Sequence, residues 1–409
     1  MSEPTLPPPA ALLLAAIRAA GSVAAPRDRA HIRQAADAAA QAGRALLEIR
    51  PPGTTLTTLR LGWPDANAPD REQMGAKAPT TLSNVPAVVW ALCLKAAWQD
   101  PSLPPYPGQP FPARLIEATS AKLGLHADAV STALRTVLPQ HGLLVTADAL
   151  LHLGPAVAAL PGPTIATLRR GHHRLPDLAA PPQAPPARNT GPTTPAHDLT
   201  PPGAMAELSS DRLVRAVITA LESSPGPLTH QDLPALSDPA IRVRAEQTLE
   251  AMGRVLLRTV HGAWITGYPD HVATALSDAG IATLNPTERT VLALVLLHTV
   301  ALPRAQGRHT HPWWNSSSHP VTLAELARNR ALPKTAISQA LRTLRAAAMV
   351  DTVARGKYIP GPALERLSEN RVATLWEDLI LAGRPAGHLA RAIARRRQAD
   401  QPTSQQESV

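Results

Sequence analysis

Residues 321–362 read VTLAELARNRALPKTAISQALRTLRAAAMVDTVARGKYIPGP, and this pattern predicts two short helices joined by a turn. Leu323, Leu326 and Ala327 fall on one face of the first helix. Pro333 opens the second helix, where its fixed φ and missing N–H cost nothing. The segment therefore begins as helix, turn, helix.

The second helix has two distinct faces. Its apolar residues recur at i, i+3, i+4 and i+7, so we expect them to point inward. They are Ile337, Ala340, Leu341 and Leu344. The opposite face carries polar and basic side chains. These are Lys334, Thr335, Ser338, Gln339, Arg342 and Arg345.

Two extended runs, residues 349–353 and 357–359, follow this helix and predict a hairpin. Helix, turn, helix and hairpin in this order resemble the winged helix-turn-helix superfamily of DNA-binding domains, in the broad manner of MarR- or GntR-like regulators. In that superfamily the second helix enters the major groove and the wing touches the flanking backbone. The resemblance implies that the polar face contacts DNA and that Arg355 and Lys357 lie on the wing. The alternative is that these polar residues only solvate a surface helix.

Composition favours a polyanionic partner. The 409 residues include 40 Lys+Arg against 31 Asp+Glu, a formal charge of +9. A single cysteine, Cys93, excludes an intramolecular disulfide and fits a reducing compartment. The first nine residues lack a basic stretch typical of a signal peptide, and no run reaches about 18 apolar residues. We therefore expect a cytoplasmic, nucleoid-associated protein with no membrane partner.

Residues 1–70 predict a helical N-terminal region with a hairpin. Helices are expected at 10–20 and 27–43, and extended runs at 46–50 and 55–61 flank the turn Pro51-Pro52-Gly53-Thr54. The region is either a degenerate winged unit that lacks one helix or a small helical cap with a hairpin.

Residues 80–162 repeat the opening pattern as a first complete winged unit. Moving this segment by 207 positions (337 minus 130) gives 12 identities in 36 between residues 125–160 and 332–367. The earlier copy lacks the basic residues of the later one. At the positions of Lys334, Arg345, Arg355 and Lys357 it has Ala127, Leu138, Asp148 and Leu150. Its wing, residues 143–153, is largely apolar, which favours self-association or a protein partner. The alternative is that the wing strands belong to the core of their own domain.

Residues 163–206 are rich in Pro, Thr and Ala and predict a disordered linker. Residues 207–276 then predict a second winged unit, with a short helix at 228–236, a helix from Pro239 and a hairpin. Basic and polar residues here are candidates for phosphate contact, although Glu246 and Glu250 reduce the positive charge of this surface. They are Arg242, Arg244, Gln247, Arg254 and Arg258. The alternative is a structural spacer.

Residues 281–370 form the third winged unit, and its first helix is expected to begin at Asn285-Pro286. An insert at 304–319 contains Trp313-Trp314, which either caps the core or stacks on a base or partner. Its histidines lack the cysteine or acidic residues that would complete a metal site. Residues 371–397 predict C-terminal helices, the last of them basic. Its candidates for phosphate contact are Arg391, Arg395, Arg396 and Arg397; the alternative is a solvated, frayed end.

The predicted fold is mainly α with short β-hairpin wings, arranged as tandem winged helix-turn-helix domains joined by a Pro-rich linker. No phosphate loop, dinucleotide fingerprint, metalloprotease motif or nucleophile elbow is present. We therefore expect a non-enzymatic protein without cofactor or metal. The leading hypothesis is a protein that binds double-stranded DNA in transcription regulation, replication initiation or DNA maintenance and repair. The rival is a protein-interaction scaffold, such as an accessory subunit of a chromosome-condensation complex.

Overall fold

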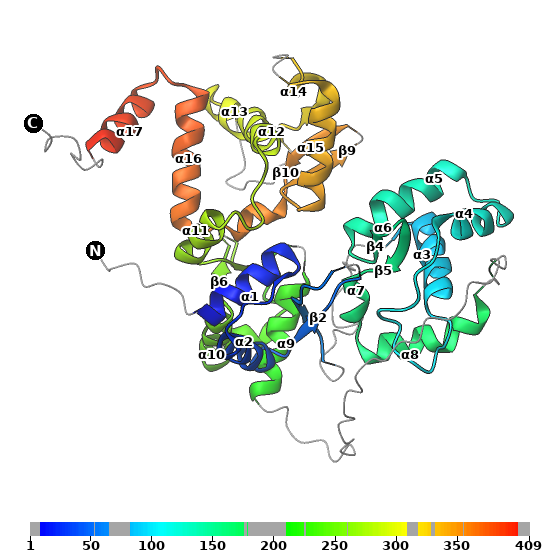
Figure 1. Cartoon of the computed structure of the whole chain (residues 1–409). Helices are drawn as coiled ribbons and strands as arrows, with labels where there is room; N and C mark the ends of the chain where they lie inside the picture. The colour runs from blue at the N-terminus through cyan, green and yellow to red at the C-terminus, as the bar shows by residue number, and fades with distance from the viewer. Residues whose placement is uncertain are drawn as a thin grey trace, which may run out of the picture. The chain divides into compact units, whose positions relative to one another are not determined.

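The computed structural model describes residues 9–52, 54–64, 82–175, 178, 210–224, 226–259, 261–308, 318–328, 332–354 and 356–399. These residues are mainly helical, with small antiparallel sheets of two or three strands, as the sequence predicted (Figure 1). They divide into two compact units. The C-terminal unit combines the residues up to Ala20 with those from Val217 onward, and the N-terminal unit holds the described residues between them.

The N-terminal unit begins with a helix and a small sheet, followed by a second group of helices and a hairpin. The first group is β1 (Val23–Ala24), α2 (Arg29–Gln41), β2 (Ala45–Ile49) and β3 (Thr58–Gly62). The second is α3 (Asn84–Ala97), α4 (Ala113–Lys122), α5 (Ala127–Thr132), a π-helical turn (Ala133–Val137), α6 (Leu138–Gln140), β4 (Leu144–Ala147), β5 (Leu150–Leu153), α7 (Pro155–Ala158) and α8 (Gly162–Gly171). The strand orders are β1-β3-β2 and β4-β5, and Phe111 adds a single bridge to Leu151.

The C-terminal unit contains α1 and two further groups of helices and strands. The first group is α1 (Pro9–Ala20), α9 (Ser210–Ser223, which belongs to this unit from Val217 onward), a 3₁₀ turn (Pro234–Ser237), α10 (Pro239–Ala251), β6 (Val255–Arg258), β7 (Trp264–Gly267) and α11 (Asp270–Asp278). The second is α12 (Pro286–Leu296), a π-helical turn (Leu297–Ala301), α13 (Leu302–Ala305), β8 (Val321–Thr322), α14 (Leu323–Leu326), α15 (Lys334–Ala346), β9 (Val350–Ala354), β10 (Lys357–Pro360), a 3₁₀ turn (Pro362–Arg366), α16 (Glu369–Gly383) and α17 (His388–Ala399). The strand orders are β6-β7, with a bridge from Leu228 to Trp264, and β8-β10-β9.

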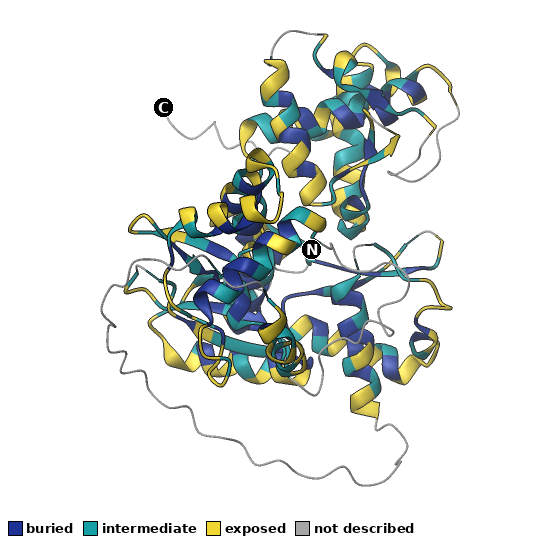
Figure 2. Ribbon diagram, turned by 90° about the vertical axis from the view of Figure 1, so that its right-hand side faces the viewer, coloured by how far each residue is buried: buried dark blue, intermediate teal, exposed yellow. Residues whose placement is uncertain are grey.

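Figure 2 shows buried residues along most of these helices and strands, and most of the buried residues are apolar. In the second group of the N-terminal unit, Leu92, Ile116, Leu138 and Leu153 are fully buried in one core. Aromatic residues make up only 3% of the chain, so these cores consist mostly of Leu, Val, Ile and Ala. Burying one such aliphatic side chain contributes about 1.5–3 kcal/mol to folding.

Each hairpin in the described residues follows a helix with the same C-terminal cap. The second residue after each helix adopts a positive φ, and these residues are Gly43, Gly142, Gly253 and Ala348, with φ of 74°, 65°, 68° and 54°. The next residue donates its N–H to the carbonyl five positions earlier, over 2.8 to 3.0 Å. This is the Schellman arrangement, which satisfies carbonyls that the helix end leaves without partners.

Each of these hairpins also ends at a glycine that neighbouring atoms approach closely. The four are Gly62, Gly154, Gly267 and Gly361. A Cβ at Gly154 would lie 2.2 Å from the carbonyl oxygen of Gly142, and one at Gly361 would lie 2.2 Å from that of Ala348. A side chain cannot be accommodated at such distances, so glycine fixes how the chain leaves the hairpin.

The first and third hairpins form a second pair that the sequence comparison missed. In both, Gly-Arg precedes a first strand that begins x-Leu-Leu, and the second strand ends at the glycine of Gly-Trp/Tyr-Pro-Asp. In both, the arginine lies over the aromatic ring: Arg44 is 3.6 Å from the centre of Trp63, and Arg254 is 4.5 Å from that of Tyr268. Because the second and fourth hairpins are also related, the chain contains two consecutive copies of one two-hairpin half.

The predicted gapless alignment is wrong over part of its length. Val130 and Ile337 are 207 positions apart, but the cap residues Gly142 and Ala348 are 206 apart (348 minus 142). The helix of the earlier copy therefore holds one additional residue. The π-helical turn Ala133–Val137 accommodates this residue, since a π turn is wider by one position.

Helix α1 belongs to the C-terminal unit, although the predicted division at residues 163–206 places it with the other half. It packs on α10 and α11. Helix α1 lies close to the turn after α10, because a Cβ at Gly253 would lie 2.5 Å from the carbonyl oxygen of Ala11. The predicted N-terminal region, residues 1–70, is therefore shared between the two units.

Two predicted boundaries are wrong. Residues 228–233 are not helical, and only a 3₁₀ turn follows at Pro234–Ser237. The Thr229 backbone N–H and hydroxyl both donate to the Asp232 carboxylate, and this local turn competes with helix formation. The chain remains helical beyond residue 163, through α8 and a 3₁₀ turn at His172–Arg174. Most of the predicted linker, residues 179–206, lies outside the described residues. Among the helices that the structure describes, none has the length and hydropathy needed to traverse a bilayer.

Candidate nucleic-acid interface

Helix α15 is positioned by its apolar face. Ile337, Ala340, Leu341 and Leu344 are all buried, as predicted, in a core shared with Val291 and Val295 of α12. Pro333 precedes the helix as its N-cap residue, with φ −62° and ψ 144°. Because four buried positions hold one side of α15, the opposite side is fixed toward solvent.

The solvent face of α15 carries the predicted site residues. Lys334, Thr335, Gln339, Arg342 and Arg345 are exposed, and Ser338 is half-buried. The guanidinium of Arg342 donates to the side-chain oxygen of Gln339 over 3.1 Å, so one turn of the helix presents these two groups together. No Asp or Glu occurs between Lys334 and Ala346, and the face therefore has a net positive charge.

The hairpin beside α15 adds one described cation. Lys357 begins β10 and is exposed, while Ile359 on the same strand is buried. The register of β9 and β10 shifts between Lys357 and Tyr358, so the pairing of the two strands is irregular beside Lys357. Arg355, the other predicted wing residue, lies outside the described residues, as do Trp313 and Trp314.

Helix α14, before the turn into α15, is held by a capping box. The Thr322 hydroxyl accepts from the Glu325 N–H, and the Glu325 carboxylate accepts from the Thr322 N–H and hydroxyl over 2.7 and 2.8 Å. These hydrogen bonds lower the pKa of the Glu325 carboxyl. Thr322 also pairs with Lys357 across the sheet, so this cap links the helices to the hairpin.

The candidates on α10 present a different surface. Arg244 and Gln247 are exposed, but so are Glu246 and Glu250, and the face carries no net positive charge. Arg242 is half-buried and donates to the carbonyl of Leu236. Arg258, on β6, is exposed and lies 5.5 Å from the centre of the Trp264 ring.

Arg254 is not available for phosphates, contrary to the sequence prediction. It is 4% exposed, donates to the Thr266 hydroxyl over 2.6 Å and lies over Tyr268. Burial lowers its pKa. Arg366 lies in the same cluster, donating to the carbonyls of Thr266 and Ser224 over 2.9 Å, and burial lowers its pKa to about 10.

The C-terminal arginines are divided between solvent and intramolecular pairs. Arg391 and Arg395 are exposed on α17. Arg396 pairs with Glu377, and Arg397 pairs with Glu377 over 3.1 Å and with Asp378 over 2.7 Å. Arg396 and Arg397 therefore hold α17 against α16 and are only partly available to another anion.

The apolar wing of the first complete unit does not provide a surface for a partner. Leu144, Leu151 and Leu153 are buried in the core of that unit, and Val145 and Leu150 are half-buried. Strand alternation directs these leucines inward, so the alternative of a domain core is confirmed. Self-association through this wing has no support in the geometry.

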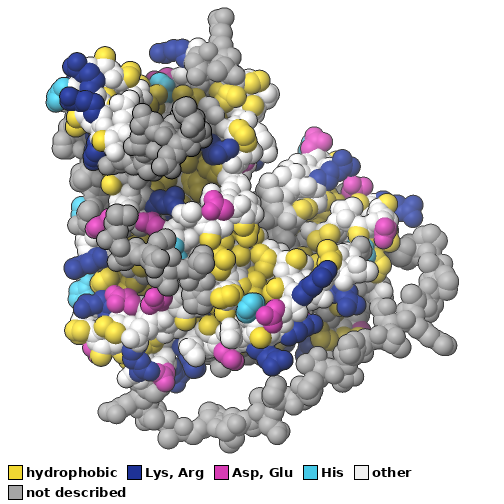
Figure 3. All heavy atoms as spheres, turned by 60° about the vertical axis from the view of Figure 1, so that its left-hand side comes forward, with side chains coloured by type: hydrophobic (Ala, Val, Ile, Leu, Met, Phe, Trp, Pro, Cys, Tyr) yellow, Lys and Arg dark blue, Asp and Glu magenta, His cyan; other side chains and the backbone are white. Residues whose placement is uncertain are grey.

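On the face shown in Figure 3, Lys and Arg side chains occur in several separate groups, with Asp and Glu near most of them. In the described part of the chain, no three His, Cys, Asp or Glu residues are grouped to hold a metal ion. A scan against protein-family models finds no match for the chain, and a search of the curated proteins finds none.

Proposed function

We propose that this chain is a DNA-binding protein built from winged-helix repeats, in which α15 is the helix that enters the major groove. The observation that carries the proposal is the sidedness of α15. One face is fully buried, and the other presents Lys334, Arg342 and Arg345 with no carboxylate in the helix. Phosphate neutralisation by such cations supplies most of the affinity of a DNA-binding surface.

The dimensions of α15 fit the groove. Its 13 residues span about 20 Å at 1.5 Å per residue, and a helix fits the major groove, which is about 12 Å wide. Gln339 and Arg342 are the residues suited to reading bases, because amides pair with adenine and guanidinium groups with guanine. Lys334, Arg345 and Lys357 are suited to phosphates.

The remaining basic residues have a supporting role in this proposal. Arg244, Arg258, Arg391 and Arg395 are exposed on elements of the same unit as α15. Additional weak phosphate contacts on one chain raise the effective concentration of the next contact. Binding of this kind suits transcription regulation, replication initiation or DNA maintenance, without catalysis by the chain itself.

The proposal is tested by fluorescence anisotropy of a labelled duplex of about 30 base pairs, titrated with the full chain over a salt series. About five phosphate contacts predict a slope of log affinity against log salt near −4 to −5. Absence of binding at about 50 mM salt, where such contacts are strong, would remove DNA as the partner.

A second candidate function, a protein-interaction scaffold, is favoured by α10. Its outward face mixes Arg244 with Glu246 and Glu250, and Val243 among them is 47% exposed. Mixed charge around an exposed apolar residue suits a protein partner better than a phosphate backbone. On this hypothesis Val243→Asp abolishes capture of the partner without changing duplex affinity, and unchanged capture would exclude α10 from such an interface.

A further inference from the structure

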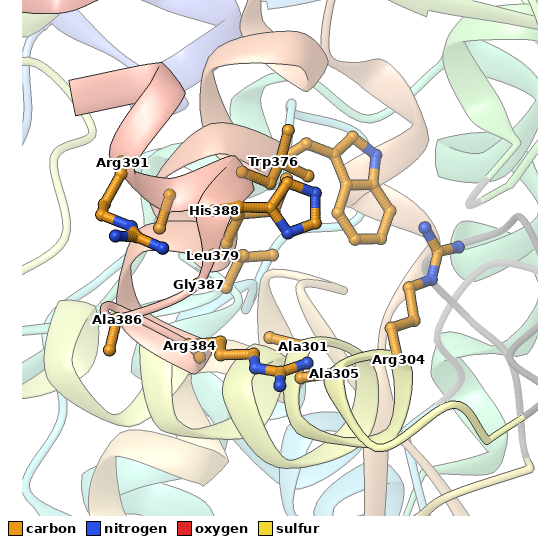
Figure 4. A pocket seen from close by; sticks show the side chains of 14 residues that line it. Ala301, Arg304, Ala305, Trp376, Leu379, Arg384, Ala386, Gly387, His388 and Arg391 are labelled. Carbon is orange, nitrogen blue, oxygen red and sulfur yellow. The ribbon is translucent and has the colours of Figure 1, made fainter. Parts of the chain in front are cut away.

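A pocket of about 810 Å³ lies in the C-terminal unit between α13, α16 and the first turn of α17 (Figure 4). Three separate segments form its walls. Ala305 comes from α13, Trp376 and Arg384 from α16 and the residue after it, and His388 and Arg391 from α17. A volume of this size accommodates a small organic molecule.

The walls are held in place by packing and by ion pairs outside the pocket. Leu379 of α16 and Ala390 and Ile393 of α17 are buried. Arg397, further along α17, pairs with Glu377 and Asp378 of α16. Glu377 and Asp378 therefore face the ion pairs, and neither of them lines the pocket.

The lining is amphipathic and cationic. Its polar side chains are the guanidinium groups of Arg304, Arg384 and Arg391 and the imidazole of His388, and the lining contains no Asp or Glu. Leu379, Ile380 and the methyl groups of alanines form apolar wall. Arg304 lies over the Trp376 ring at 4.0 Å, which joins a cationic and an aromatic surface on one side.

The backbone at the start of α17 adds to the positive potential. Gly387 accepts the first helical hydrogen bond, from the Arg391 N–H over 3.1 Å. The preceding N–H groups of a helix have no partner within it, and they carry partial positive charge. Gly387, His388 and Leu389 all line the pocket, so this end of the helix borders the same space as the arginines.

We infer that this pocket binds an amphipathic organic anion, with a ring or short hydrocarbon body and one sulfonate, carboxylate or phosphate group. The body packs on Trp376 and Leu379, and the anionic group is held by Arg384 and Arg391. The inference does not rest on DNA binding, because no residue of α15 or its hairpin lines the pocket, and of the supporting arginines named above only Arg391 does.

The test uses two fluorescent probes on the full chain. The first is 8-anilinonaphthalene-1-sulfonate, an amphipathic anion, and the second is N-phenyl-1-naphthylamine, the same ring system without the sulfonate. The anion should bind at one site per chain and about tenfold or more tightly than the neutral probe, the difference expected for one charge-assisted hydrogen bond. Equal affinity for the two probes would overturn the inference, and this comparison needs no variant.

Variants then locate the binding site. Arg384→Gln and Arg391→Gln should each weaken sulfonate binding about tenfold, and Ala305→Trp should block it by filling the pocket. Arg289→Gln, which removes an exposed arginine from α12 outside the pocket, is the control and should bind as the parent does. Parent-like binding by both Arg384→Gln and Arg391→Gln would place the anion elsewhere and refute the assignment.

Discussion

Arg18 reaches Glu222 across 204 positions of sequence. Its guanidinium donates to the backbone carbonyl of Glu222 over 2.7 Å and lies 4.0 Å from the carboxylate. The Glu222 side chain is 1% exposed, whereas that of Arg18 is 35% exposed. Arg18 therefore brings charge from α1 to a buried carboxylate at the end of α9, in the cluster that includes Arg254 and Arg366.

Arg18→Ala should lower the free energy of unfolding by about 1–3 kcal/mol, because it removes a hydrogen bond to the Glu222 backbone carbonyl and a cation from beside the buried Glu222 carboxylate. Urea denaturation of the full chain measures the change. Arg33→Ala, which removes an exposed arginine from α2, is the control and should change stability by less than about 0.5 kcal/mol. Equal effects of the two substitutions would show that the Arg18–Glu222 pair contributes nothing.

Removing residues 1–20 should destabilise the C-terminal unit more than Arg18→Ala does. Helix α1 buries Leu14 and Ile17, each 1% exposed, and burial of each side chain contributes about 1.5–3 kcal/mol. Thermal unfolding followed by circular dichroism should show an early transition in the truncated chain. An unchanged melting curve would mean that α1 is not part of this unit.

Gly361→Ala should destabilise the unit that contains α15 by at least about 2 kcal/mol, because the new Cβ would meet the Ala348 carbonyl oxygen at 2.2 Å. Gly171→Ala is the matched control. Its Cβ would meet nothing within 4 Å at the end of α8, and alanine there should stabilise by up to about 1 kcal/mol. Denaturant midpoints compare the two variants, and similar midpoints would refute the close approach at Gly361.

Glu365→Gln should raise stability at neutral pH and have little effect in acid. Burial raises the pKa of the Glu365 carboxyl above its ordinary value of 4.5, and neither side-chain oxygen has a hydrogen-bond partner. The folded state thus favours the protonated form, so stability falls as pH rises through the folded pKa. Removing the charge should raise the free energy of unfolding by roughly 0.5–1 kcal/mol at about pH 7. At a pH well below the ordinary glutamate pKa, the substitution should leave the free energy of unfolding unchanged.

Urea denaturation at about pH 7 and about pH 3.5, on either side of the ordinary glutamate pKa, measures this difference. Glu246→Gln, an exposed position on α10, serves as the control and should show no such dependence. If the difference in free energy of unfolding between Glu365→Gln and the parent is the same at both pH values, burial does not disfavour the charged form of Glu365.

The helix-turn-helix segment could be predicted because its information is local. Ile337, Leu341 and Leu344 follow the helical period, and Pro333 and Asn285 mark where helices begin. The same local reasoning recognised hairpins at all four places. It could not place α1, since the approach of Ala11 to Gly253 joins residues 242 positions apart (253 minus 11).

The errors in the candidate site have physical causes. Arg254 resembles a surface arginine in sequence, but the cap at Gly253 turns it toward Tyr268. The sequence contained a signal for this arginine–aromatic pairing, because Gly-Arg and Gly-Trp/Tyr-Pro-Asp recur around the first and third hairpins. The pocket beside α17 left no such signal, since Ala305, Trp376 and Arg391 meet only through packing of separate helices.

The role of α15 is tested by comparing duplex affinity and its salt dependence in two variants. One is Lys334→Ala with Arg342→Ala, which leaves the buried face of α15 intact. The other is Arg135→Ala, which removes an exposed arginine of the earlier copy that the sequence alignment pairs with Arg342. Fluorescence anisotropy with one duplex gives both quantities.

If α15 binds DNA, the double variant should bind the duplex roughly tenfold or more weakly than the parent at about 0.15 M salt. The magnitude of its salt slope should fall by about one, because Lys334 neutralises a phosphate in the parent whereas Arg342 reads a base. Arg135→Ala should match the parent in both respects. Parent-like affinity and slope in the double variant, with its fold intact by circular dichroism, would remove α15 from the interface and refute the proposed function of this helix.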